Sequence, residues 1–162
     1  MVIRCETGES VSVKADALAG ADLRDLNLHR AMLDGADLRG ADLRRSDLRS
    51  AGLERAALDR ADLRGARLPA CNASSASFEG ADLREAMMRS GIFDDANFTD
   101  ADLGGADIGR ACLRRARLAG ANLRCTGIDE ADLSGSIADT RTVWPDGFDA
   151  HARGVSIVDE ST

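Results

Sequence analysis

The chain is poor in the residue types that catalysis and large cores usually need. Its 162 residues include no Tyr, one Trp, four Phe and two His, and aromatic side chains make up 3%. So few aromatic side chains predict a narrow interior without a substrate cavity. The two histidines, His29 and His151, have no nucleophile–base constellation and no glycine-rich phosphate loop beside them. The sequence therefore predicts a protein that is not an enzyme, with no catalytic residues and no cofactor.

Paired cysteines, long apolar runs and surplus positive charge are also missing. Cys5, Cys71, Cys112 and Cys125 form no C-x-x-C pair and have no histidine at zinc-ligand spacing, so we expect reduced thiols and no metal site. No apolar run reaches the length of a membrane span, and the first ten residues lack a signal-peptide core. With 21 basic and 28 acidic residues, the net charge is -7. We therefore expect a cytoplasmic protein that binds neither membranes nor nucleic acid directly.

What the chain has instead is a repeat of five residues. In "GADLRGADLRRSDLRS", residues 35–50, the leucines fall five apart and a small residue precedes each by two. The frame continues from Ala21 to residue 140, which makes 24 units. The central residue is Leu, Ile, Met or Phe in 22 units, and it is Ala in two, at Ala73 and Ala138. Internal repetition therefore dominates the fold prediction.

A period of five fits neither an α-helix nor a straight strand. Steps of five scatter side chains around a helix axis and alternate between the faces of a strand, so either would leave many leucines in water. A chain that bends once per unit turns every leucine inward, and four right-angled bends close a square of twenty residues. Stacked squares would pair their backbones about 4.8 Å apart. The sequence therefore predicts stacked coils of twenty residues.

The units "ADLRG", "ADLRR", "ANFTD", "ANLRC" and "ADLSG" resemble the A-(D/N)-L-x-x units of pentapeptide-repeat proteins. The resemblance implies an all-β fold, a right-handed quadrilateral β-helix, here with about six coils and short caps at both ends. We divide the chain into an N-terminal cap at 1–15, the β-helix at 16–140, and a C-terminal cap and tail at 141–162. The family says little about function, because one fold serves many roles.

The two ends need caps, because an open coil exposes leucines and unpaired backbone. Residues 2–13, with the alternating "VSV", predict a short pair of strands. The only Trp lies in "TVWPDGFD", and we expect Trp144 and Phe148 to cover the last coil. "VSIV" at 155–158 predicts a final strand.

One level of the core looks underfilled. Stacking at twenty residues places Ala73 in a column of leucines, where it would leave a void below Leu53 that Phe93 can enter from the next coil. Phe78 and Phe98 fall in a neighbouring column, so the aromatic residues would cluster around the weak centre. Simple drift among apolar residues explains the same pattern.

The outward positions carry the charges. Stacking predicts a column of aspartates beside a column of arginines that ends at Gly104 and resumes at Arg124. We expect this ladder to balance its own charge, with little gain in stability from each exposed pair. The aspartate column consists of Asp22, Asp42, Asp62, Asp82 and Asp102, and the arginines beside it are Arg24, Arg44, Arg64 and Arg84.

Acidic charge and outward apolar side chains coincide in the region 87–112, around the coil 91–110. Five aspartates there are expected to form a girdle facing only Arg110, and three apolar residues take outward positions that elsewhere hold Asp or Asn. No EF-hand or nonapeptide pattern supports calcium binding. The candidate partner surface comprises Met87, Ile92, Asp94, Asp95, Asp100, Asp102, Asp107 and Cys112.

Two functions are compatible with these patterns. The first is a scaffold or protein-binding module with an unknown protein partner. The second follows from the resemblance, since some members of that family protect DNA gyrase by imitating duplex DNA, for which the aspartate column would be the mimic surface. The arginines beside that column argue against mimicry. The short, glycine-containing tail predicts a monomer or weak dimer rather than a dimer joined by C-terminal helices.

Overall fold

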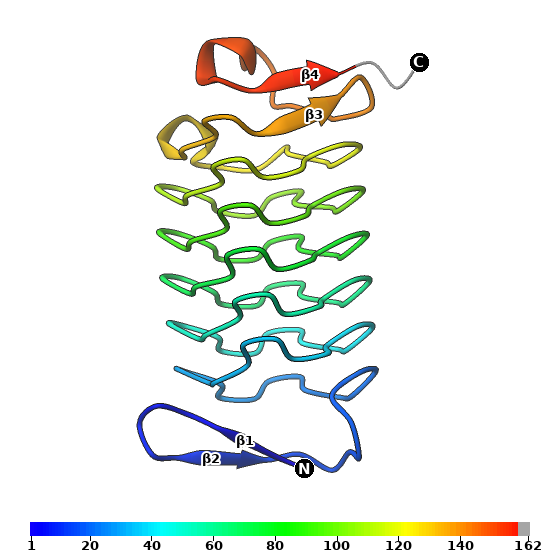
Figure 1. Ribbon diagram of the computed structural model, residues 1–162, viewed down its shortest axis with the longest axis vertical. Helices are drawn as coiled ribbons and strands as arrows, with labels where there is room; N and C mark the ends of the chain where they lie inside the picture. The colour runs from blue at the N-terminus through cyan, green and yellow to red at the C-terminus, as the bar shows by residue number, and fades with distance from the viewer. Residues whose placement is uncertain (159–162) are drawn as a thin grey trace.

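Parallel β-bridges that recur every twenty residues organise the chain, of which the computed structural model describes residues 1–158. The inward leucine of each unit donates its N–H to the next coil, as Leu23 does to the carbonyl of Asp42 at 2.8 Å. Figure 1 shows the coils stacked along the long axis. The predicted twenty-residue stacking repeat is confirmed. The four columns of bridges begin at Asp22, Asn27, Met32 and Asp37.

From Gly20 to Gly120, every fifth residue is left-handed and turns the chain into the next side of the coil. Glycine takes this position at Gly65, but Asp25 and Arg45 also have φ of 57° and 55° there. A left-handed conformation costs a non-glycine residue about 1–2 kcal/mol. Stacking imposes it nevertheless, because the corner N–H then reaches the next coil, as Arg45 N–H reaches the carbonyl of Arg64 at 3.1 Å.

The interior is a continuous stack of apolar side chains. Its central residues are fully buried, and the alanines two positions earlier are at most 8% exposed from Ala41 to Ala131. Small side chains at these positions leave room for the leucines, because both sets point into the same tube. One column of centres, twenty residues apart, is fully buried at each of its members, Leu38, Leu58, Phe78, Phe98 and Leu118.

Three phenylalanines meet in the middle of this core, as predicted. The rings of Phe78 and Phe98 stack with centroids 4.9 Å apart, and Phe93 contacts both edge-on at 6.0 and 5.7 Å. A Cβ built on Gly91 would lie 2.6 Å from Cε2 of Phe93. Gly91 therefore replaces the usual alanine because the Phe93 ring occupies that space. Ala73 is fully buried, and the filling of its gap by Phe93 stays a prediction.

The five-residue frame shifts near the C-terminal end, where our prediction of one unbroken frame is wrong. Asp107 pairs with Thr126, nineteen residues later, and Asn122 pairs with Val143, twenty-one residues later. The 3₁₀ helix η1 (Ile128–Glu130) follows Gly127, which has φ of 74°. A Cβ on Gly127 would lie 2.6 Å from the backbone of Gly109. Glycine fits this close approach of two backbones, and the register of twenty returns at Asp132 and Ile137, which pair with Cys112 and Arg117.

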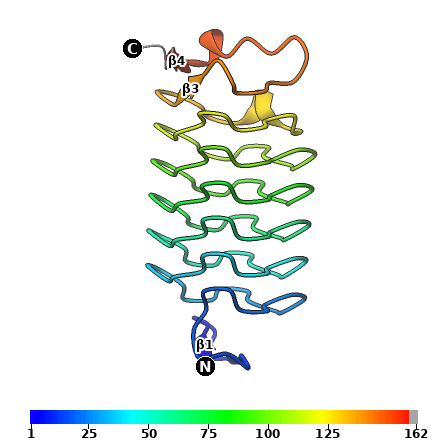
Figure 2. The same cartoon turned by 90° about the vertical axis from the view of Figure 1, so that its right-hand side faces the viewer.

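The N-terminal end has the predicted strand pair. β1 (Val2–Arg4) and β2 (Ser10–Ser12) form an antiparallel hairpin. Cys5 joins it to the first coil by an antiparallel bridge with Ala31. The hairpin lies at one end of the stack and the last strands lie at the other (Figure 2).

At the C-terminal end, β3 (Ile137–Asp139) and β4 (Ser156–Val158) pair in parallel, which confirms the final strand. The 3₁₀ helix η2 (His151–Arg153) precedes β4. The rings of Trp144 and Phe148 stack at 5.3 Å and pack against the core, as expected for a lid. The rest of the predicted tail, 159–162, lies outside the described residues. Within the described residues, no helix has the length and apolar character needed to cross a membrane.

Candidate interaction surfaces

The Asp or Asn at the second position of a unit has a structural role that sequence reasoning missed. Its side chain accepts the backbone N–H two residues later, as Asp22 Oδ1 accepts the N–H of Arg24 at 3.2 Å. Coil stacking leaves that N–H without a carbonyl, so the short side chain satisfies it in a local Asx turn. Asn72 and Asn97 serve the same purpose at Ser74 and Thr99. The motif A-(D/N)-L-x-x therefore encodes a backbone cap as well as an inward leucine.

In two units the second residue has no side chain that can accept the backbone N–H two residues later. In these units an aspartate of the preceding coil accepts that N–H instead. Asp34 Oδ1 accepts the N–H of Glu54 at 2.8 Å, and a Cβ on Gly52 would lie 2.9 Å from that carboxylate. Asp94 Oδ1 likewise accepts the N–H of Arg114 at 3.1 Å. Asp94 is therefore engaged in holding the backbone together, and it is only 8% exposed.

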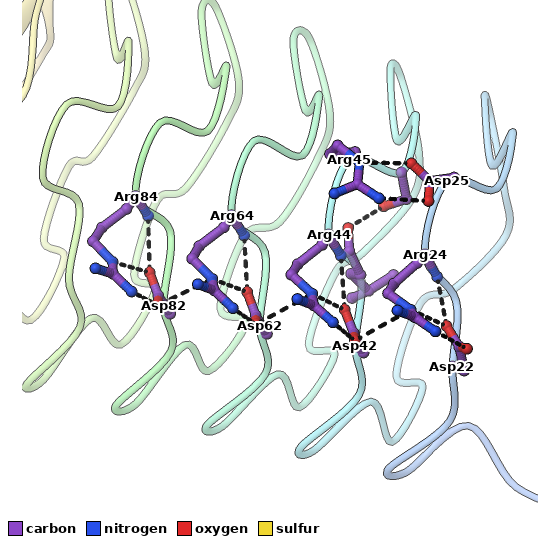
Figure 3. Close-up of polar contacts among 12 residues, drawn as sticks. Asp22, Arg24, Asp25, Asp42, Arg44, Arg45, Asp62, Arg64, Asp82 and Arg84 are labelled. Atoms are coloured by element: carbon purple, nitrogen blue, oxygen red, sulfur yellow. Dashed lines mark hydrogen bonds and ion pairs between the residues drawn. The ribbon is translucent and has the colours of Figure 1, made fainter.

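The aspartate column forms a continuous ladder with its arginines (Figure 3). Asp42 accepts two hydrogen bonds from the guanidinium of Arg44, from Nε at 2.8 Å and from Nη2 at 2.6 Å. Nε of Arg24, one coil earlier, lies 3.4 Å from the same carboxylate. The corresponding contacts between coils recur at 3.5, 3.5 and 3.8 Å up to Asp102. The prediction that a column of arginines lies beside the aspartate column and balances its charge is confirmed.

The paired hydrogen bonds from the arginine guanidinium groups keep the aspartates of the column ionised. The hydrogen bonds from the Arg24 guanidinium lower the pKa of Asp22 to about 2. The arginine two residues later likewise lowers the pKa of Asp42, Asp62 and Asp82, against a smaller opposing effect of burial. The first four aspartates of the column are thus each matched by an arginine two residues later, unlike the unshielded charges of a phosphate backbone.

Asp102 ends the ladder differently, because Gly104 stands where an arginine is expected. It accepts the N–H of Gly104 at 2.9 Å and the side-chain amide of Asn122 at 2.8 Å. Its side chain is 41% exposed, against 28% for Asp82. Asp102 is therefore the most open carboxylate of the column after Asp22.

The expectation that the acidic girdle faces only Arg110 is wrong. Asp95 pairs with Arg115 at 2.7 Å, and Arg115 lowers the pKa of this aspartate by hydrogen bonding. Arg110 instead lies 3.5 Å from Glu130. Arginines from neighbouring coils reach the remaining acids, because stacking at about twenty residues brings distant parts of the sequence together. These pairs are Asp94–Arg114, Asp100–Arg141, Asp102–Arg84 and Asp107–Arg89.

The predicted apolar residues are exposed but do not all share one side of the coil. Met87 is 47% and Ile92 is 41% exposed, and Cys112 is half-buried. Ile92 pairs directly with Cys112 in the bridge ladder, whereas Met87 pairs with Asp107. A corner at Ser90, with φ of 55°, separates Met87 from Ile92. The surface therefore wraps around an edge of the stack.

The same two units leave backbone donors open. Neither Met87 nor Ile92 can accept a hydrogen bond in the way that Asp or Asn does at this position. Within residues 1–158, the N–H groups of Arg89 and Asp94 have no acceptor. An apolar side chain and an open donor therefore lie next to each other twice along this coil.

The thiols and carboxylates of the described residues offer no catalytic or metal arrangement. All four cysteines are free, and burial raises the pKa of Cys71 and Cys125 to about 12. No three His, Cys, Asp or Glu residues of the described part are grouped to hold a metal ion.

Several proteins of known structure match this chain. HetL, a pentapeptide repeat protein involved in heterocyst differentiation regulation from the cyanobacterium Nostoc sp. strain PCC 7120, is 31% identical with a TM-score of 0.41. The match covers 76% of this chain and 54% of HetL, so the chain spans about half the length of that relative. The pentapeptide repeat protein alr5209 from Nostoc PCC 7120 is 32% identical over 71% of this chain and 86% of its own, with a TM-score of 0.35.

A trypsin-treated form of QnrB1, a plasmid-mediated fluoroquinolone resistance protein, is 21% identical with a TM-score of 0.39; 78% of this chain and 76% of that one are covered. No curated protein matches the chain. The family model described as pentapeptide repeats matches in eight copies, over residues 17–49, 51–89, 76–115 and 101–137. Because these matches extend over most of its length, the chain belongs to the pentapeptide repeat family.

Proposed function

We propose that this protein is a non-enzymatic interaction module that binds a protein partner through the surface around Met87 and Ile92. The observation that carries the proposal is the exposure of two large apolar side chains at positions where Asp or Asn would cap the backbone. The architecture we infer is the right-handed, four-sided β-helix of about six coils between caps at 1–15 and 141–162, in a cytoplasmic protein.

Three features support this surface. The apolar side chains of Met87 and Ile92 offer area to bury, and buried apolar anchors supply most of the energy at interfaces. The backbone N–H of Arg89, an exposed residue, can donate to a carbonyl oxygen of a partner. The acidic side chains around this surface are held in ion pairs. They can therefore help to orient a partner without attracting cations in general.

The test is capture from the native host followed by mass spectrometry, with Met87→Ser combined with Ile92→Ser. The captured partner should be lost with this double variant and retained with Ile137→Ser, a matched control in which an exposed apolar residue changes on another coil. Equal capture by the double variant and the wild type would refute the proposed surface. Thermal unfolding of each variant separates lost binding from lost folding.

A second candidate, protection or inhibition of DNA gyrase by mimicry of DNA, is favoured by one observation. Asp22, Asp42, Asp62, Asp82 and Asp102 do stack in one column along the rod. The arginine forks weigh against it, because a mimic of DNA needs uncompensated charge. A gyrase supercoiling assay tests this alternative: inhibition that is lost on changing Asp42 and Asp62 to Asn, but that is indifferent to Met87 and Ile92, would reverse our order of preference.

A further inference from the structure

An apolar groove lies at the N-terminal end of the stack, between β1 and the first coil. Its lining includes Val2 and Arg4 from β1, Leu18 from the connection, and Met32 and Asp34 from the first coil. Met32 and Val2 are 59% and 57% exposed, the two highest values among the large apolar residues of the described chain. The groove therefore concentrates apolar surface that nothing in the fold covers.

Two opposite charges lie in the wall of the same groove. Arg4 and Asp34 are both exposed, and in residues 1–158 neither takes part in an ion pair. Asp34 accepts the N–H of Glu54 with Oδ1, which leaves Oδ2 available to a partner. These two residues differ from the aspartates and arginines of the ladder, which neutralise one another within the chain.

We propose that this groove binds a second copy of the same chain, end to end, across a two-fold axis. In a two-fold dimer both copies contribute the same patch. If residue i of one copy contacts residue j of the other, then residue j of the first copy also contacts residue i of the second, so the contact occurs twice. Arg4 of one copy would then face Asp34 of the other at both edges, while Val2, Leu18 and Met32 of each copy fill the centre. Only a patch with both charges is complementary to itself in this way.

The centre of the patch offers only three apolar side chains, those of Val2, Leu18 and Met32, so we expect a weak association. A two-fold dimer joined at this end would point its two stacks away from each other and leave both Met87–Ile92 surfaces accessible. Such a dimer binds a repetitive partner with higher avidity than a monomer does. The dimer does not depend on the function proposed above.

Sedimentation equilibrium of the full chain, from about 1 µM to about 1 mM, tests the proposal because weak dimers dissociate in this range. We expect a monomer–dimer equilibrium that Met32→Ser weakens by about tenfold or more, because each copy loses a central apolar contact. Ile137→Ser, the matched control at the far end, should leave the equilibrium unchanged. A monomer at all concentrations, assembly beyond a dimer, or indifference to Met32→Ser would overturn the proposal.

A charge-swap experiment identifies the two-fold geometry. Arg4→Glu alone places two acids opposite each other, and Asp34→Lys alone places two bases opposite each other, so each variant should self-associate about tenfold less than the wild type. An equimolar mixture of the two should recover wild-type affinity, since both contacts in the mixed dimer become attractive. No recovery, with both variants folded by circular dichroism, would refute the Arg4–Asp34 contact. Asp34→Asn controls for the bond to Glu54, because the amide keeps an acceptor.

Discussion

The contact between Gly91 and Phe93 allows a quantitative test of how the core is packed. Replacing Gly91 by alanine adds one methyl group, and the backbone there is not in the left-handed region that would oppose it. That methyl would meet Phe93 Cε2 at 2.6 Å, Phe93 Cζ at 3.0 Å and the carbonyl of Met88 at 3.1 Å. The ring cannot retreat easily, because Phe78 and Phe98 lie against it and all three are fully buried.

Gly91→Ala should therefore lower the free energy of unfolding by about 1–3 kcal/mol, the usual effect of overpacking. Phe93→Leu should also destabilise, by about 1–3 kcal/mol, through lost burial and ring contacts. With Leu at position 93, however, Gly91→Ala should be neutral or stabilise by about 0.4–1 kcal/mol, because alanine restricts the unfolded chain. The two changes should thus be coupled by about 1–4 kcal/mol.

Urea unfolding of the four proteins in this double-mutant cycle, followed by circular dichroism, measures the coupling. Ala111→Gly, one coil later in the same column, is the matched control and should destabilise by about 1 kcal/mol through lost burial and added chain entropy. Additive effects of Gly91→Ala and Phe93→Leu would refute the steric explanation for Gly91. So would wild-type stability of Gly91→Ala with Phe93 present.

Three further predictions concern the core, the charges and the lid. Leu63→Ala should destabilise by about 2–5 kcal/mol, whereas Ala73→Leu should be tolerated or lose about 1–3 kcal/mol; equal unfolding midpoints for wild type and Leu63→Ala would contradict the packing. Hydrogen bonds from arginine lower the pKa of Asp22 and Asp37 to about 2, below the value of about 4 that aspartate has in the unfolded chain. These aspartates therefore stabilise the folded state fully above about pH 4, and this contribution is lost as the pH falls toward 2. A melting temperature that does not fall over that interval would contradict this. Truncation after residue 140 removes Trp144 and β4 and should promote end-to-end association in light scattering; an unchanged monomer would contradict the lid.

Much of the fold could be predicted from the sequence because the repeat is local. Nearly every unit places its own large apolar residue inward, and many units also supply the Asp or Asn that accepts their own backbone N–H. Five residues are therefore enough to specify one side of a coil. The hairpin, the Trp144–Phe148 lid and the final strand were also predictable, because alternation and turn residues mark them. The local shift at Thr126 was not, because the five-residue pattern of the sequence continues through it with Ile128 at the centre of its unit.

For the candidate surfaces, the five-residue pattern alone predicts which side chains point outward, and therefore that Met87 and Ile92 are exposed. How these side chains combine depends on the stacking of the coils. Arg115 reaches Asp95 because stacking places residues twenty positions apart side by side. The charge of one coil is thus set by its neighbours, and a count along the sequence finds an excess of acid where the folded chain has ion pairs. The open groove beside Met32 has the same origin, since a hairpin far from it in the sequence forms its other wall.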